Sequence, residues 1–296
     1  MDLTYSKIQN LRDYFFNIRQ RALNYPSLHK LFLKKNGYAL DLKNPITHNQ
    51  KINYKKLFDR DPLIPITSDK YLVRDYIRKV LGDEVADEIL IPIFGFSSTG
   101  QDLPFEDWDF EFFMKANHFS GGNMLVSPGM DPQFLRTICK KWLSTSYGQA
   151  LHEWGYRDIH RRIICEKVLR DETGEIPNDY KFYCFQGKVK MIVILKDRFT
   201  NQQLVYIDAE RNPILGAQMS NIETLNPVPE IPNYERMVAL AEKLAQPFAH
   251  VRIDFYSFGK ETYFGEITHY SGSGLNKFDD YQVDLKLGKK WEKIGE

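Results

Sequence analysis

Residues 249–274 read AHVRIDFYSFGKETYFGEITHYSGSG and carry the clearest structural pattern in the chain. Val251, Ile253 and Phe255 alternate with polar residues, Gly259 interrupts the run, and a second alternating run follows. Alternation with a period of two on both sides of a glycine predicts a β-hairpin. We expect one face of this hairpin to join a core and the other face to carry polar side chains.

The polar face of the predicted hairpin brings two carboxylates together. A turn centred on Lys260 places Asp254 opposite Glu266 and Arg252 opposite Thr268, with opposed Cβ atoms about 5 Å apart. At an effective dielectric constant of about 20, two such charges repel by roughly 3 kcal/mol. A cation would remove this repulsion, and Mg²⁺ is commonly held by one or two carboxylates together with substrate phosphates. The alternative is a solvated face on which the two acids splay apart.

The motif R-I-D, followed by E-I-T and a Ser/Gly-rich tail, resembles the metal-binding end of the ATP-grasp ligases. More narrowly, most of the chain is similar to the TupA-like ATP-grasp family of cell-surface polysaccharide gene clusters. The resemblance implies an α+β fold whose two lobes clasp ATP, with Mg²⁺ held by Asp254 and Glu266 and with Arg252 acting in catalysis. Many ATP-grasp enzymes place Asn two residues after the Glu as a further metal ligand. Thr268 occupies that position here and is the candidate for a second-metal ligand.

Composition narrows the class of protein. The chain has 296 residues, of which 43% are hydrophobic and 27% charged, with a formal net charge of +1. Such a balance is typical of a globular protein and gives no overall field that would attract nucleic acid. Three cysteines without CxxC spacing argue against a disulfide framework or a zinc site. With no signal-peptide or membrane-spanning pattern either, we expect a cytoplasmic protein.

The first 36 residues predict two helices separated by Pro26, one face of which is basic. This face either covers a domain as a solvated surface, associates weakly with anionic membranes, or docks on an anionic substrate. Its basic residues are Lys7, Arg12, Arg19, Arg21, Lys30, Lys34 and Lys35. The predicted domains are a helical N-terminal region, residues 1–64, a small ATP-grasp lobe with a phosphate-binding loop, residues 65–164, and a large lobe with the hinge and the metal-binding hairpin, residues 165–296.

Local signals predict further elements. Ser68 and Asp69 offer N-cap oxygens to a helix ending at Leu81, and Asp131-Pro132 begins another helix. Further predicted elements are strands at 89–96, 110–117 and 159–169, a hairpin across Gln186-Gly187, and a helix at 234–246 capped by Asn233.

The family resemblance extends to the candidate nucleotide site. The string S-D-K-Y-L-V-R sets Arg74 where ATP-grasp enzymes supply a cation to the phosphates, although a basic helical stripe also occurs on solvent-facing helices. Lys115 ends a predicted strand, and the small-residue loop after it resembles the flexible lid over the triphosphate. That loop contains Ser120, Gly121 and Gly122.

By the same resemblance, the string E-K-V-L holds adenine through Glu166, Lys167 and Val168. Asp179 is available to the ribose hydroxyls and Lys181 to phosphate, or else the two form an exposed strand-end pair. The tail of the hairpin has enough glycine and serine to present N–H donors to a substrate carboxylate. Its candidate substrate-binding residues are His269, Ser271, Gly272 and Ser273.

The resemblance implies an ATP-dependent ligase that forms an amide through an acyl phosphate. It further implies that one substrate is an amino acid and the other a sugar or sugar nucleotide, in the synthesis of capsule, O-antigen or a related polysaccharide. Which substrate supplies the carboxylate, and the oligomeric state, are open. A glycosyltransferase is the alternative, with Asp107 and Asp109 as a D-x-D-like pair; these acids precede a predicted strand rather than following one.

Overall fold

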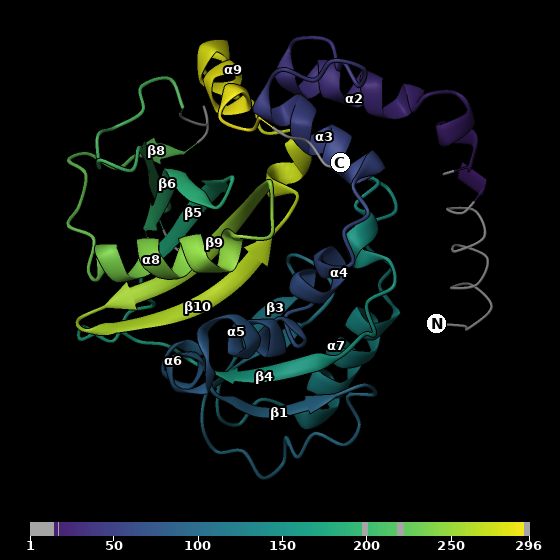
Figure 1. The fold of residues 1–296 in the computed structure, drawn as a ribbon. Helices are drawn as coiled ribbons and strands as arrows, with labels where there is room; N and C mark the ends of the chain where they lie inside the picture. The colour runs from purple at the N-terminus through teal and green to yellow at the C-terminus, as the bar shows by residue number, and fades with distance from the viewer. Residues whose placement is uncertain (1–14, 17, 197–200, 218–221, 293–296) are drawn as a thin grey trace. The chain divides into compact units, whose positions relative to one another are not determined.

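The computed structural model describes residues 15–16, 18–196, 201–217 and 222–292 (Figure 1). The chain forms two compact units, each assembled from separate segments. Unit 1 comprises residues 1–30, 62–73 and 91–168, and unit 2 comprises residues 31–61, 74–90 and 169–296. The chain passes from unit 1 to unit 2 between Val168 and Leu169, directly after the predicted adenine segment. The sequence-based domain boundaries after residues 64 and 164 stay a prediction.

Unit 1 is built on a four-stranded antiparallel sheet in the order β1-β4-β2-β3. Helix α7 packs against β2 and β4. Its first turn is capped as predicted, since the Asp131 side chain accepts a hydrogen bond from Gln133 N and Pro132 follows at the first helical position. The elements lying wholly in unit 1 are α4 Leu63–Ser68, β1 Ile93–Ser97, β2 Phe112–Ala116, β3 Asn123–Val126, α7 Pro132–Ser144, η1 Trp154–Tyr156 and β4 Ile163–Lys167.

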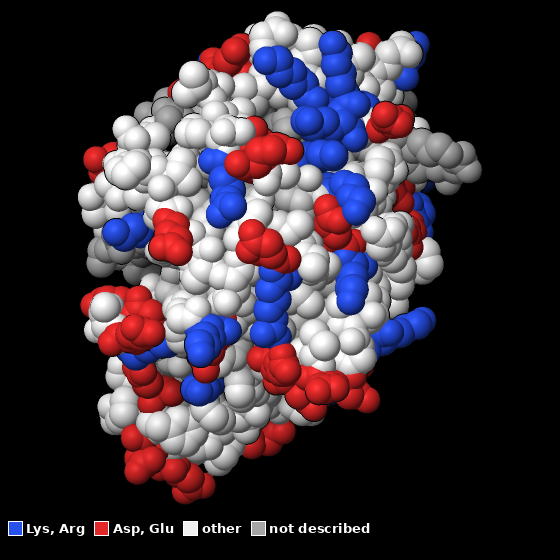
Figure 2. All heavy atoms as spheres, turned by 60° about the vertical axis from the view of Figure 1, so that its left-hand side comes forward, with Lys and Arg blue, Asp and Glu red and all other residues white. Residues whose placement is uncertain are grey.

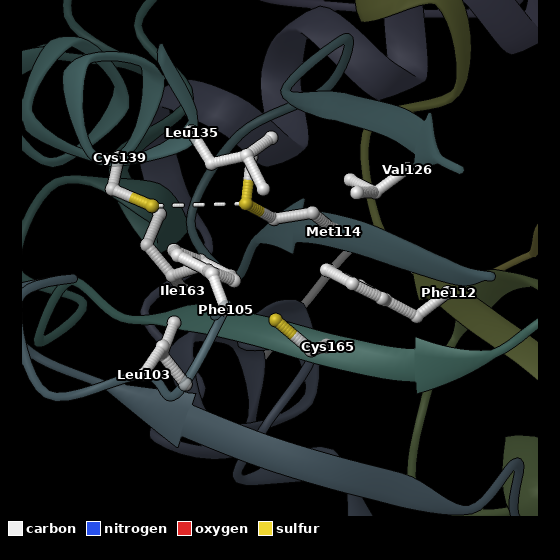
Figure 3. Packing of buried hydrophobic residues seen from close by; sticks show 9 residues of the cluster. All are labelled: Leu103, Phe105, Phe112, Met114, Val126, Leu135, Cys139, Ile163 and Cys165. Carbon is white, nitrogen blue, oxygen red and sulfur yellow. Dashed lines mark hydrogen bonds between the residues drawn. The ribbon is translucent and has the colours of Figure 1, made fainter. Parts of the chain in front are cut away.

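The core of unit 1 lies between this sheet and α7. Figure 3 shows Met114, Cys139 and Cys165 among the buried side chains, with the Cys139 Sγ atom directed at the Met114 Sδ atom at 3.6 Å. Burial raises the pKa of the Cys139 thiol to about 12, so it remains a neutral, apolar packing group. All three cysteines are buried free thiols.

Unit 2 is built on a six-stranded sheet in the order β10-β9-β5-β6-β7-β8. Helix α8 packs against β9, β5 and β6 (Figure 1). Its apolar residues Met237, Leu240 and Leu244 are buried. The strands are β5 Asp179–Phe185, β6 Lys188–Lys196, β7 Gln203–Ile207, β8 Glu223–Thr224, β9 His250–Phe258 and β10 Glu261–Thr268. Its helices are α3 His48–Phe58, α6 Asp83–Ile89, α8 Tyr234–Ala245, η2 Ser271–Gly274 and α9 Tyr281–Lys289, whereas α2 Pro26–Asn36 and α5 Val73–Leu81 run across unit boundaries.

The hairpin formed by β9 and β10 has the predicted register around Asp254 and Glu266. Asp254 pairs with Glu266 and Arg252 with Thr268. The turn itself is shorter than predicted, because Glu261 already pairs with Phe258. A β-bulge between Phe264 and Glu266 then shifts the register by one residue and restores the expected pairing. Gly265 occupies the bulge, where an added Cβ would lie only 3.1 Å from the Asp254 carbonyl oxygen.

Three local predictions are wrong in detail. The helix expected from Ser68 to Leu81 is two helices, because α4 ends at Ser68 and the Asp69 side chain accepts hydrogen bonds from the turn residues Tyr71 and Leu72 before α5 begins. The strand expected at 89–96 begins only at Ile93, since α6 extends to Ile89. Asn233 precedes α8 but makes no side-chain cap, because its amide donates instead to the β9–β10 hairpin.

The surface carries nearly balanced charge. Figure 2 shows acidic and basic side chains mixed over much of one face, with a denser basic group near the top of the view. Of the helices in the described ranges, none combines the length and the apolar character that a bilayer span requires.

Replacing Phe112 with alanine should lower the free energy of unfolding by about 3–5 kcal/mol, because its buried ring leaves a cavity in the core of unit 1. Phe110→Ala is the matched control, since Phe110 is 37% exposed near the same strand. Denaturant titration checks both variants. Equal losses would show that Phe112 is not a core residue.

Candidate active site

The polar cluster of unit 2 lies on one face of three neighbouring strands. β9 lies between β10 and β5, and the register sets Lys181 of β5 beside Asp254 of β9. Side chains of a strand alternate between faces, so Arg252 and Asp254 share a face while Ile253 and Phe255 are buried on the other. The structure thus brings together six of the predicted site residues: Asp179, Lys181, Arg252, Asp254, Glu266 and Thr268.

Asp254 is held by two cations. Arg252 donates from Nε to Asp254 Oδ1 at 2.6 Å and from Nη2 to Asp254 Oδ2 at 2.7 Å, and Lys181 Nζ donates to the same Oδ2 at 2.9 Å. Lys181 also pairs with Asp179. The predicted alternative of an exposed strand-end pair is therefore wrong: Asp179 is buried and Lys181 links two acids.

Glu266 is the more exposed carboxylate of the pair. Its Oε1 atom accepts from Arg252 Nη2 at 2.8 Å and from Thr268 Oγ1 at 2.9 Å, while its side chain is 39% exposed. The repulsion expected between Asp254 and Glu266 is thus relieved by the guanidinium that lies between them. The two acids therefore face each other across the hairpin and do not splay apart.

Burial dominates the protonation equilibria of this cluster. Desolvation raises the pKa of Asp254, although Arg252 and Lys181 act in the opposite direction. Burial also lowers the pKa of Lys181, but the charges of Asp254 and Asp179 outweigh it and leave that pKa raised. The ammonium and guanidinium groups therefore stay charged at neutral pH.

The donor set fits Mg²⁺ better than a softer metal. Carboxylates and a hydroxyl supply only hard oxygen ligands. Within the described residues, no group of three or more His, Cys, Asp or Glu side chains is arranged to hold a metal alone. Asp254 and Glu266 would therefore share a magnesium ion with phosphate oxygens, as Mg²⁺ sites commonly do.

The two carboxylates should differ in their effect on stability. Asp254→Asn turns an amide N–H₂ toward buried cationic donors, so the free energy of unfolding should fall by about 3 kcal/mol. Glu266→Gln alters a partly exposed group and should cost about 1 kcal/mol or less. Thermal and denaturant unfolding check this prediction, and equal losses would contradict the asymmetric burial of the pair.

In unit 1, Lys115 and Glu166 form an ion pair. β2 and β4 run side by side, and Lys115 Nζ lies 2.5 Å from Glu166 Oε2. The Glu166 side chain thus points to the candidate phosphate-binding lysine. The N–H of Lys167 donates to the Pro92 carbonyl at 2.9 Å, so this group of the predicted adenine segment is already used.

The loop between β2 and β3 is anchored at its base. Asn117 is fully buried, and its amide donates to Asp69 Oδ1 at 2.8 Å and to the His160 carbonyl at 2.9 Å. Lys70, which the sequence places one residue after Asp69, donates to the Phe119 carbonyl at 3.0 Å. These contacts were not predicted, because the residues lie far apart in the chain.

Only the tip of this loop is exposed. Ser120 and Gly121 face solvent, whereas Phe119 and Gly122 are buried. Gly121 has a φ of +84° with no atom near an added Cβ, while a Cβ on Gly122 would lie 2.4 Å from the Phe119 ring. Gly121 is therefore required for backbone conformation and Gly122 for space.

His118 is a structural residue. It is buried, its Nε2 atom lies 3.0 Å from the Thr145 carbonyl oxygen, and burial lowers its pKa to about 4. A neutral buried histidine contributes stability that is present above the unfolded pKa of about 6.5 and is lost as the pH falls toward 4.

Between pH 6.5 and pH 4, the free energy of unfolding should fall by up to about 3 kcal/mol less in His118→Gln than in the unmodified protein. The reason is that glutamine has no imidazole to take up a proton in this range. Denaturant midpoints measured across this range check the effect. His160→Gln, which makes the same replacement at an exposed histidine, is the control variant. A parallel profile for His118→Gln would mean that His118 titrates alike in both states.

The Ser/Gly segment after β10 is tied to α3. Ser271 and Ser273 are buried, Lys55 Nζ lies 3.1 Å from His269 Nδ1, and Lys56 Nζ donates to the Ser273 carbonyl at 2.7 Å. Sequence reasoning did not include these two lysines in the site. Lys55 and Lys56 lie on α3, a helix that is almost wholly buried.

The predicted site residues thus divide between the two units. Unit 1 contains Lys115, the 120–122 loop and the 166–168 segment, and unit 2 contains the acidic hairpin, Lys181 and the Ser/Gly turn. Arg74 lies half-buried in the first turn of α5. The roles of all these residues in binding stay predictions.

Two α+β units, one with a lysine-linked glycine loop and the other with an acidic hairpin, are features of the ATP-grasp class. The chain belongs to the TupA-like ATPgrasp family, whose model matches residues 50–292. The predicted family and α+β fold class are confirmed. No curated protein matches the chain.

Similar solved structures are distant. The chain is 17% identical to D-alanine–D-alanine ligase from Bacillus anthracis complexed with ATP, covering 69% of this chain and 54% of that one, with a TM-score of 0.40. The Helicobacter pylori D-alanine–D-alanine ligase is 16% identical, with 76% of this chain and 61% of that one covered and a TM-score of 0.41. An ADP complex of purK, N5-carboxyaminoimidazole ribonucleotide synthetase, is 11% identical, with 70% of this chain and 46% of that one covered and a TM-score of 0.43. The chain spans about half to three fifths of the length of these proteins.

Proposed function

We propose that this protein is an ATP-dependent carboxylate–amine ligase that forms an amide through an acyl phosphate. The observation that carries the proposal is the cluster on the hairpin of a TupA-like ATPgrasp chain, in which Arg252 and Lys181 hold the acid pair Asp254 and Glu266. Phosphoryl transfer depends mainly on positioning and on neutralising charge, which this cluster is equipped to provide.

The chain's own residues suggest distinct roles. Asp254 and Glu266 would hold Mg²⁺, which when bound neutralises charge on the phosphates. Lys181 and Lys115 would bind phosphate oxygens by exchanging their present carboxylate partners. Arg252, already bound to Glu266 and Thr268, would stabilise charge on the phosphorylated carboxylate. Arg74 is proposed as a further phosphate cation, and the 166–168 segment as an adenine wall.

The proposed substrates are an amino acid and a nucleotide-linked sugar, for cell-surface polysaccharide synthesis in the cytoplasm. The family resemblance supports this assignment. Weak association with anionic membranes is proposed from the exposed Arg19, Arg21, Lys30, Lys34 and Lys35; Lys7 and Arg12 lie outside the described residues. No observation favours the glycosyltransferase alternative, since Asp107 and Asp109 are exposed and lie before β2.

Release of ADP and phosphate tests the reaction. With ATP and Mg²⁺, a screen of amino acids against nucleotide-linked amino sugars and uronates should give ADP only when both partners are present. Glu266→Gln should reduce turnover at least 100-fold, since it removes a charged metal ligand while leaving the fold intact. Glu261→Gln, at an exposed residue of the same strand, is the control.

Two results would contradict this proposal. Release of a nucleoside diphosphate from the sugar donor, with ATP untouched, would indicate a glycosyltransferase. Near-normal turnover of Glu266→Gln at saturating Mg²⁺ would remove Glu266 from the metal site.

We propose that the exposed tip of the β2–β3 loop closes over the triphosphate and excludes water. A non-hydrolysable ATP analogue should slow amide hydrogen exchange across residues 117–124. Gly121→Ala should weaken binding of the analogue about fivefold, because alanine resists a φ of +84°. Gly129→Ala is matched in φ and open space, and should bind normally. Equal exchange with and without the analogue would exclude a lid.

A further inference from the structure

Helix α3 carries three buried lysines in unit 2. Lys51, Lys55 and Lys56 are 8%, 2% and 0% exposed, although lysine is rarely buried fully. Lys51 donates to the carbonyls of Gly288 and Trp291 near the end of α9. Lys55 and Lys56 instead serve the segment that follows the acidic hairpin.

Side chains of α2 and α3 donate hydrogen bonds to the backbone carbonyls of the turn Ser271–Gly274. Lys56 Nζ donates to Ser273 O at 2.7 Å and to Ser273 Oγ at 3.0 Å. Asn53 Nδ2 donates to Gly274 O at 2.9 Å, and Asn36 Nδ2 donates to the same oxygen at 3.3 Å. Two successive carbonyls of the turn are therefore directed at α3 and α2.

The turn has an unusual backbone that these contacts stabilise. Gly272, Ser273 and Gly274 have φ values of +53°, +56° and +64°. Serine seldom adopts this left-handed region, and such residues persist where their surroundings enforce the conformation. There is no space for a side chain at Gly274, since an added Cβ would lie 2.5 Å from Asn53 Nδ2.

The orientation of the carbonyls determines where the opposite side of the turn points. In a trans peptide the C=O of one residue and the N–H of the next are antiparallel. Because Ser273 O faces Lys56, the N–H of Gly274 points away from α3, and the hydrogen bond at the oxygen polarises that N–H. Backbone N–H groups of such turns can form anion-binding sites. The N–H of Ser273 donates within the turn to the Tyr270 carbonyl at 2.7 Å, so the Gly274 N–H is the donor that this argument uses.

A second observation points to a ligand at this turn. Ser271 is 4% exposed, and its Oγ atom has no hydrogen-bond partner among the described residues. A buried hydroxyl without a partner is costly, and one in a loop next to a candidate site calls for an explanation. Ser271 lies three residues after Thr268, which contacts Arg252 and Glu266.

We propose that the turn Ser271–Gly274 binds the carboxylate of a substrate and that Lys56 is the residue that positions it. Lys56 does not contact the substrate. Its ammonium group holds the Ser273 carbonyl from behind, which aims the Gly274 N–H at the carboxylate and adds positive potential to the turn. This inference rests on the proposed ligase function for the identity of the substrate, and it adds a buried helix to the substrate site.

The test measures carboxylate binding without turnover. Sodium D-glucuronate and sodium L-glutamate are titrated into the ¹⁵N-labelled full chain while the amide resonances of Gly272 and Gly274 are followed, with sodium chloride at equal ionic strength as the reference. At least one carboxylate should shift the Gly274 amide in a saturable manner. Lys56→Met should raise its dissociation constant about tenfold or more, while the affinity for an ATP analogue stays within twofold.

Lys51→Met is the matched control, because it removes a buried lysine of the same helix that serves α9 instead of the turn. It should leave the carboxylate dissociation constant unchanged. If Lys56→Met does not fold, Lys56→Gln and Lys51→Gln replace the pair, with the same difference expected. Equal carboxylate dissociation constants for the Lys56 and Lys51 variants would overturn the proposal. So would the lack of a saturable shift of the Gly274 amide resonance with either carboxylate. Absence of ADP release in the substrate screen would contradict the ligase function. The carboxylate titration would still be interpretable, because it does not depend on turnover.

Discussion

The ion pair between Arg252 and Asp254 is the contact on which the polar face of unit 2 depends. Asp254 is 3% exposed, and an isolated carboxylate at that depth would be strongly destabilising. Two guanidinium N–H groups satisfy its oxygens, and Lys181 supplies a further donor. The same guanidinium also reaches Glu266, so one arginine allows two acids to face each other across β9 and β10.

This arrangement connects stability to chemistry. A buried ion pair contributes little net stability, because desolvation offsets the attraction between the charges. Its value here is orientation, because Arg252 and Lys181 hold both carboxylates in one place on the sheet. The Lys115–Glu166 pair of unit 1 has the same character, since an acid on β4 fixes the orientation of a lysine on the neighbouring strand β2.

Buried polar side chains also shape the loops. Asn117 anchors the glycine loop of unit 1 through Asp69 and His160, and Lys56 anchors the Ser/Gly turn of unit 2. In both units glycines allow the positive φ angles of the loop, and buried polar groups from distant segments stabilise that backbone conformation. Such networks favour one conformation because a partly satisfied network is costly.

Sequence by itself determined the hairpin, the cap of α7, the apolar stripe of α8 and the pairing of Asp254 with Glu266. These follow from local periodicity and from residues that lie close together in the chain. Tertiary structure decided that Arg252 and Lys181 neutralise the acids, that Asn233 binds the hairpin instead of capping α8, and that Lys56 holds Ser273 across 217 residues. The reason is physical: burial, and the hydrogen bonds that burial makes obligatory, depend on segments that the fold brings together from distant parts of the chain.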